Sequence, residues 1–109
     1  MKKMLWISYD LGVKGDYEGL YAWLDNHEAK ECGNSIAMLK YEYTTDLVDE
    51  IQKDLSECMS LARHDRIYMI WREDSKIKGK FLFGKRKAAP WSGYGSQEPQ
   101  VDEELQEHG

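Results

Sequence analysis

The sequence predicts an α+β fold in which one antiparallel sheet carries two helices on one face. Three observations support this class. Short apolar runs rich in β-branched and aromatic residues recur at residues 4–11, 35–43 and 66–71, as strands do. Two intervening segments repeat apolar side chains every three to four residues, as amphipathic helices do. The 109-residue chain is long enough for one domain with one core.

The first strand and the first helix are separated by a short turn. Residues 4–11, "MLWISYDL", form the predicted strand, which ends near the single carboxylate of Asp10. Gly12 and Gly15 bracket the turn, and Asp16 is a suitable N-cap for the helix that follows. The apolar face of this helix is formed by Tyr17, Leu20, Tyr21 and Leu24.

The segment after this helix, "EAKECGNSIAMLKYEY", is open to two interpretations. The helix either continues to Lys30 or stops near Asn26 and gives way to a short strand. We prefer the second, with a hairpin across Gly33 and Asn34 that leads into a strand at residues 35–43.

A second helix is expected after Thr44, Thr45 and Asp46, each of which can act as an N-cap. Its predicted apolar stripe consists of Leu47, Ile51, Leu55, Cys58 and Ala62.

The C-terminal part of the domain is predicted to form two further strands. "RIYMIW", residues 66–71, has the composition of an inner strand, and "REDSKIKG" is a polar connection. "KFLFGK" is a short last strand with Phe81 and Phe83 on one side, and regular structure is expected to end from Ala88 onward.

This order of elements fits the split β-α-β arrangement of ferredoxin-like folds. Such a sheet has one face without helices, and burying it against a second copy would make a homodimer. The sheet is expected to carry several aromatic residues, among them Trp6, Tyr41, Tyr43, Tyr68 and Trp71.

Charge is distributed unevenly along the chain. Residues 1–62 carry six basic and twelve acidic side chains, whereas residues 63–95 carry nine basic and three acidic ones. Residues 96–109 carry five acidic side chains and no Lys or Arg. We therefore expect a domain at 1–95 and an acidic, disordered tail at 96–109, which either only solubilises the protein or folds back over the basic block.

The cysteine and hydropathy patterns argue against two classes of protein, zinc-binding proteins and membrane-spanning proteins. Cys32 and Cys58 lie far apart without a CxxC partner, so we expect ordinary reduced thiols and no zinc site. No apolar run approaches the roughly 18 to 20 residues of a membrane helix, so a cytoplasmic protein without membrane contact is expected.

The run "KIKGKFLFGKRK" mixes cations with stacking surfaces, a combination that single-stranded RNA or DNA can use. The candidate nucleic-acid-binding residues are Lys80, Lys85, Arg86, Lys87 and Trp91. The alternative is an edge strand whose lysines, Lys76, Lys78 and Lys80, prevent aggregation between sheet edges.

Several short motifs together resemble the CRISPR-associated-two superfamily, most closely its stand-alone bacterial and phage branch. They are "YDL", "DYEGLYAWL", "NSIAML", "DRIYMIW" and "AAPWSGYG", within residues 4–94. The resemblance implies a ferredoxin-like homodimer, either a metal-dependent endoribonuclease or a protein of toxin and antitoxin systems. It also implies that Asp10 is the catalytic residue, as a ligand of Mg²⁺ that activates water near a phosphate.

The sequence departs from the nuclease pattern after Asp10, where Lys14 is the nearest cation and Asp16 and Glu18 add negative charge. Asp10 can instead simply end the strand and bind the following turn. Two hypotheses follow. One is a dimeric Mg²⁺-dependent phosphodiesterase in which Asp10 of both copies holds metal. The other is a noncatalytic dimeric binding module in phage defence or toxin and antitoxin control.

Overall fold

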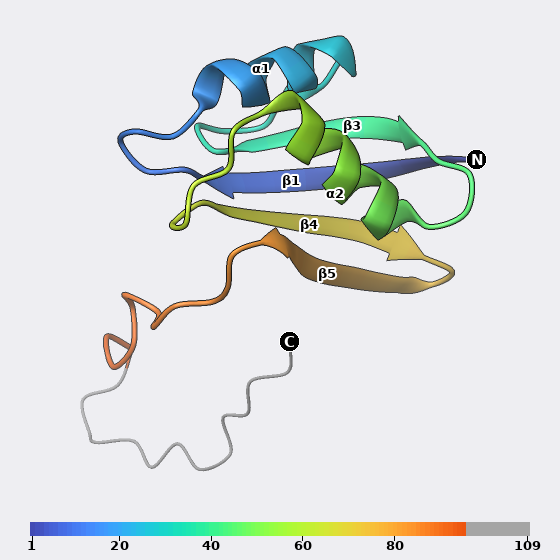
Figure 1. Cartoon of the computed structure of the whole chain (residues 1–109). Coiled ribbons are helices and arrows are strands. Elements are labelled where there is room, and N and C mark those ends of the chain that lie inside the picture. Colours follow the sequence, from blue (N-terminus) through green and yellow to red (C-terminus); the bar gives the residue numbers. More distant parts are fainter. Residues whose placement is uncertain (96–109) are drawn as a thin grey trace.

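A computed structural model describes residues 1–95 of the chain (Figure 1). The elements, in order, are β1 (Lys2–Asp10), α1 (Tyr17–Asn26), β2 (Lys30–Glu31), β3 (Ile36–Glu42), α2 (Leu47–Cys58), β4 (Arg66–Glu73) and β5 (Lys76–Phe83). The five strands form one antiparallel sheet in the order β2-β3-β1-β4-β5, which confirms the predicted α+β class. This order is compatible with a split β-α-β arrangement, with β5 added beside β4. The predicted tail, residues 96–109, lies outside the described residues.

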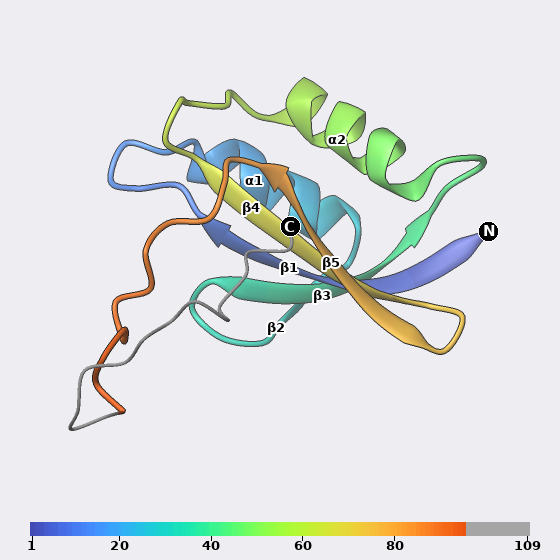
Figure 2. The same ribbon diagram turned by 90° about the horizontal axis from the view of Figure 1, so that it is seen from below.

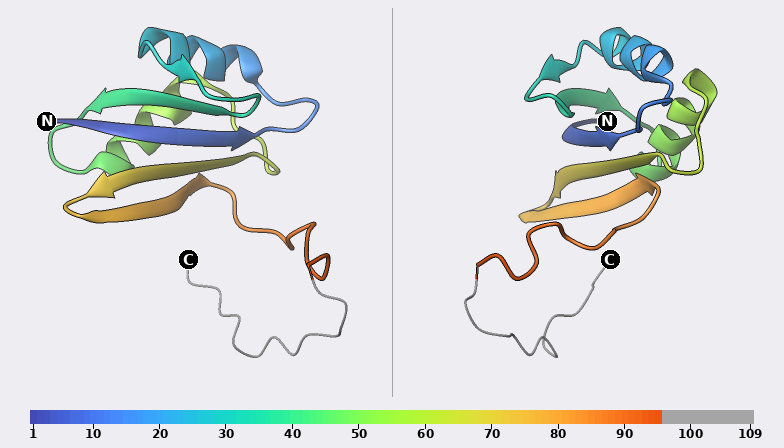
Figure 3. Two further views of the ribbon diagram at one scale, coloured as in Figure 1. Left: turned by 180° about the vertical axis from the view of Figure 1, so that it is seen from behind. Right: turned by 90° about the vertical axis from the view of Figure 1, so that its left-hand side faces the viewer.

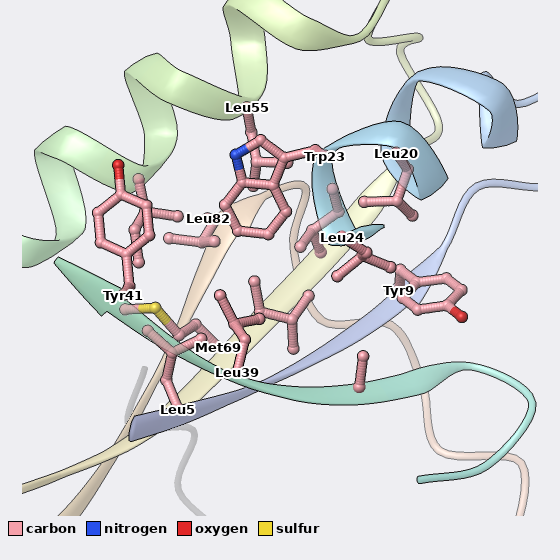
Figure 4. Packing of buried hydrophobic residues seen from close by; sticks show 14 of the residues in the cluster. Leu5, Tyr9, Leu20, Trp23, Leu24, Leu39, Tyr41, Leu55, Met69 and Leu82 are labelled. Carbon is pink, nitrogen blue, oxygen red and sulfur yellow. The ribbon is translucent and has the colours of Figure 1, made fainter. Parts of the chain in front are cut away.

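The core lies between the sheet and the two helices, which cover the same face of the sheet (Figures 2 and 3). Alternate strand residues are buried because side chains along a strand point to opposite faces. In Figure 4, Trp23 of α1 and Leu55 of α2 lie over Leu39 and Met69 of the sheet. Within residues 1–95 the opposite face carries no helix, as predicted.

The start of α1 is held by Asp16, the predicted N-cap. Its Oδ1 accepts a hydrogen bond from the Gly19 N–H at 2.9 Å, and its Oδ2 accepts one from the Ser60 N–H at 2.7 Å. The helix stops at Asn26, and Lys30 of β2 pairs with Met38 of β3. The preferred interpretation, a short strand and a hairpin, is therefore confirmed.

Helix α2 begins at the predicted N-cap Asp46, whose side chain accepts from the Asp49 N–H. Three of the five residues of the predicted stripe, Leu47, Ile51 and Leu55, are buried. The stripe is wrong beyond them, because the helix ends at an exposed Cys58 and Ala62 lies exposed after it. Met59 instead adopts an extended conformation that buries its own side chain.

One carboxylate connects both helices to the sheet. Asp54 Oδ2 accepts from the Trp23 indole N–H at 2.9 Å, from the Tyr41 hydroxyl at 3.3 Å, and lies 3.3 Å from His27 Nε2. Burial and the nearby Asp54 raise the pKa of Tyr41 to about 12, so its hydroxyl remains a donor.

The β4–β5 hairpin is longer than predicted. The polar connection was expected to span residues 72–79, but the strands continue through most of it and leave only Asp74 and Ser75 as the turn. Phe81 and Phe83 do not share one side of β5 either, because a register shift occurs near Tyr68. Phe81 pairs with Tyr68, whereas Phe83 packs against the buried core.

Glu50 makes the turn before α2 sensitive to acid. Its carboxylate accepts from the backbone N–H groups of Thr44, Thr45 and Asp46, and these bonds lower its pKa from 4.5 to about 2. The stabilisation is complete above pH 4.5 and is lost as the pH falls toward 2. We expect Glu50→Gln to lower the melting temperature at pH 7 and to differ less from wild type at pH 2. Thermal unfolding at both pH values measures this, and an equal difference at both would contradict it.

None of the helices within residues 1–95 has the length and apolar character needed to cross a membrane.

Candidate nucleic-acid interface

A row of lysines follows one side of the edge strand β5. Lys76, Lys78 and Lys80 pair with Glu73, Trp71 and Met69 of β4, so they point toward the helix side of the sheet. All three lysines are exposed, and Lys78 donates to Glu73 at 3.0 Å. We name these lysines, together with Lys85, Arg86 and Lys87, the basic ridge.

The basic ridge continues beyond β5 because the chain turns at Gly84. This residue has a φ of +83°, and a Cβ there would lie 2.6 Å from the Asp65 carbonyl oxygen, so the turn requires glycine. Residues 85–87 are exposed, and the Arg86 guanidinium lies over the rings of Tyr68 and Phe81, 6.0 and 5.7 Å from their centroids.

Of the predicted nucleic-acid-binding residues, the structure brings Lys80, Lys85, Arg86 and Lys87 to one end of β5. Trp91 is different: it is 73% exposed and lies in a turn where its carbonyl accepts from the Tyr94 N–H. Figure 1 shows this part of the chain, in orange, extending away from the sheet.

The face of the sheet without helices, which we name the open face, carries apolar side chains at its centre and charged ones toward the strand ends. Its side chains alternate with the buried ones and stand in register across four strands. Ile70 of β4 lies at the centre, between Trp6 of β1 and Gly79 of β5. The apolar residues of the open face are Met4, Trp6, Ile36, Met38, Tyr68, Ile70, Ile77 and Phe81.

Two of the aromatic residues considered for the sheet, Trp6 and Tyr68, lie on the open face, but three do not. Tyr41 and Trp71 belong to the core, where they are 7% and 6% exposed, and Tyr43 packs against the core. The cause is strand register, since a residue's face depends on whether its position is odd or even along the strand.

Asp10 is the last residue of β1 and lies on the open face, opposite Arg66 of β4. Its Oδ2 accepts from the Arg66 guanidinium at 2.8 Å, and its side chain is 56% exposed. The hydrogen bond from Arg66 holds the pKa of Asp10 below its usual value, with smaller contributions from Lys87 and the Gly12 N–H. Asp10 is therefore ionised and already paired with a cation.

The Asp10–Arg66 pair lines an open groove of about 440 Å³ on the open face. The Arg66 Nε atom is buried and has no hydrogen-bond partner among residues 1–95. Ser8 shares this face with Asp10, as its position two residues earlier predicts. The groove is lined by Ser8, Tyr9, Asp10, Ile36, Arg66, Tyr68, Ile70, Phe81 and Arg86.

The residues around Asp10 do not fit a magnesium site within one protomer. Mg²⁺ prefers several oxygen ligands, usually with more than one carboxylate or phosphate. Within residues 1–95, no group of three or more His, Cys, Asp or Glu side chains is arranged to hold a metal ion. One oxygen of Asp10 is engaged by Arg66, so we derive no metal-dependent step for the single chain.

Arg66 is the residue of the candidate site that sequence reasoning missed. It lies 56 positions from Asp10, and only the antiparallel register of β1 and β4 brings the two together. The available signal was weak: an arginine begins the strand "RIYMIW" just as an aspartate ends the strand before the first helix.

Comparison of the chain with protein-family models, with curated proteins and with solved structures found no match. The fold and the arrangement of the side chains therefore carry the functional argument.

Proposed function

We propose that the protein binds single-stranded nucleic acid along the basic ridge and does not cleave it. The observation that carries this is the row of three exposed lysines on the helix side of β5. The cations of residues 85–87 follow along the chain, and among them Arg86 lies on the side of the open face, over Tyr68 and Phe81. Successive lysines two residues apart on a strand are spaced by about 6.6 Å. This is close to the repeat of phosphates along an extended single strand, so one strand can contact the lysines in turn.

We also propose that the protein is a ferredoxin-like homodimer of the CRISPR-associated-two-like type. The order of β2, β3, β1 and β4 and the position of Asp10 at the end of β1 support the resemblance. The apolar open face supports pairing, because such a face is costly to leave in water. Lys76, Lys78 and Lys80 point to the other side of the sheet, so a second copy on the open face leaves them accessible.

The noncatalytic alternative is favoured over the Mg²⁺-dependent nuclease by the Asp10–Arg66 pair. A carboxylate that binds metal must give up competing partners, and Arg66 holds Asp10 by a charged hydrogen bond of 2.8 Å. Phage defence or toxin and antitoxin control is the setting that the resemblance suggests for such a module.

Binding is tested with a fluorescent single-stranded RNA of mixed sequence, by anisotropy over a range of salt concentrations. We expect the triple variant Lys80→Glu, Lys85→Glu, Lys87→Glu to bind at least 100-fold more weakly than wild type. Losing three phosphate contacts should also reduce the slope of log affinity against log salt by about 2. The matched control reverses Lys2, Lys14 and Lys53, which lie outside the basic ridge. Equal losses in both variants would contradict the proposed site.

Cleavage is tested with the same RNA in Mg²⁺ and in Mn²⁺, comparing wild type with Asp10→Ala. The proposal predicts intact RNA with both proteins. Metal-dependent cleavage by wild type that Asp10→Ala abolishes would overturn the noncatalytic proposal and assign Asp10 to catalysis.

A further inference from the structure

A second cleft lies on the helix side of the sheet, between α1 and the β2–β3 hairpin. It has a volume of about 390 Å³, and its floor is apolar, with Leu24, Ala29 and Ala37 among its lining residues. Two tyrosines, Tyr9 of β1 and Tyr21 of α1, also line it. We name it the tyrosine cleft.

The two rings of the tyrosine cleft stand nearly perpendicular, at 74°, with centroids 6.3 Å apart. Tyr9 is 8% exposed and its hydroxyl donates to the Asn34 carbonyl at 3.4 Å, whereas Tyr21 is 50% exposed. Two perpendicular rings in edge-to-face contact form a corner, and a cation seated in this corner can meet the negative face of a ring. The fixed Tyr9 and the more exposed Tyr21 thus make a partly preformed corner.

The charged groups at the tyrosine cleft favour a cation as well. Asp25 and Glu31 both line it. Glu31 pairs with the buried Ala37, so its side chain lies on the α1 side of the sheet. Lys30 also lines the cleft, and in β2 it pairs with Met38 of the open face. Two carboxylates therefore stand against one ammonium group among the charged lining residues.

The pKa of the Tyr9 hydroxyl reflects the burial and the charges at the tyrosine cleft. Burial raises its pKa, and the neighbouring Tyr21, Tyr17 and Glu31 raise it further. Of these neighbours Glu31 is the carboxylate, and it opposes a negative charge at the cleft and favours a positive one.

We propose that the tyrosine cleft binds a small organic ammonium ion. The rings of Tyr9 and Tyr21 contact its methyl or methylene groups, and the carboxylates of Asp25 and Glu31 balance its charge. The ligand class is distinct from the phosphates proposed for the basic ridge, and the inference does not depend on that proposal. A volume of about 390 Å³ accommodates an ion of the size of choline.

The test is a titration of the ¹⁵N-labelled protein with choline, followed by amide chemical shifts. We expect saturable shifts at residues of the tyrosine cleft, and at least fivefold weaker binding of 3,3-dimethylbutanol, the neutral analogue of choline. Trimethyllysine amide is titrated in parallel, since tighter binding of this probe would point to a lysine side chain as the natural source of the ammonium group. No saturable shifts, or equal binding of the neutral analogue, would overturn the proposal.

Three exposed positions allow matched variants. Tyr21→Ala should weaken choline binding at least tenfold, whereas Tyr21→Phe keeps the ring and should retain binding within about twofold. Glu31→Gln should weaken it severalfold, and Glu57→Gln, which removes the same charge from an exposed position of α2 outside the cleft, should not. Unchanged affinity in both Tyr21→Ala and Glu31→Gln would overturn the proposal even if choline binds.

Discussion

Replacing Ile70 with aspartate is expected to convert the proposed dimer into a monomer. Ile70 lies at the centre of the open face, beside Trp6 and Gly79. In a two-fold interface the substitution places one charge from each copy at the centre of the contact, where it replaces an apolar side chain and must lose its hydration. We expect the dissociation constant to rise at least 100-fold, measured by analytical ultracentrifugation over a concentration series.

The control for this experiment is Val13→Asp. Val13 is fully exposed in the turn after β1, so its replacement adds the same charge away from the open face. Circular dichroism checks that both variants fold. A wild-type protein that remains monomeric at all concentrations would refute the dimer, and an Ile70→Asp variant that remains dimeric would move the interface elsewhere.

Gly19→Val is expected to lower the free energy of unfolding by about 3 kcal/mol, through overpacking and loss of a helix cap. A Cβ at this position would collide with Asp16 Oδ2 and would lie 2.8 Å from both the Cys58 carbonyl oxygen and Met59 Cβ. Because two of the three obstacles belong to the end of α2 and the residue after it, α1 would have to move away from α2. The corresponding fall in melting temperature is roughly 15 °C.

Thermal and urea unfolding measure the effect of Gly19→Val. Gly95→Val is the matched control, since a Cβ at Gly95 meets nothing within 4 Å. A loss of less than about 1 kcal/mol in Gly19→Val would show that the helices can separate without cost.

Local sequence signals predicted most of the elements. Asp16 and Asp46 mark the two helix starts because a side-chain oxygen there meets unpaired backbone N–H groups, which is a contact within four residues. The buried positions Ile51 and Leu55 follow from helical spacing in the same way. The end of α2 did not follow, since the burial of Met59 depends on distant parts of the chain.

The candidate site was harder to predict because it depends on register. Lys76, Lys78 and Lys80 share a side by simple alternation, so their grouping was predictable. The pairing of Asp10 with Arg66 and the burial of Trp71 require knowing which strands are neighbours and how they align. The sequence therefore predicts the basic ridge better than it predicts the state of Asp10.

The two hydrogen bonds accepted by Asp16 have a consequence for local opening. One bond is made within the first turn of α1, but the other reaches Ser60, 44 positions along the chain. The Asp16 carboxylate therefore anchors both the first turn of α1 and the segment after α2. When either part frays, the other loses a partner, so the two open together as one cooperative unit rather than as separate loops.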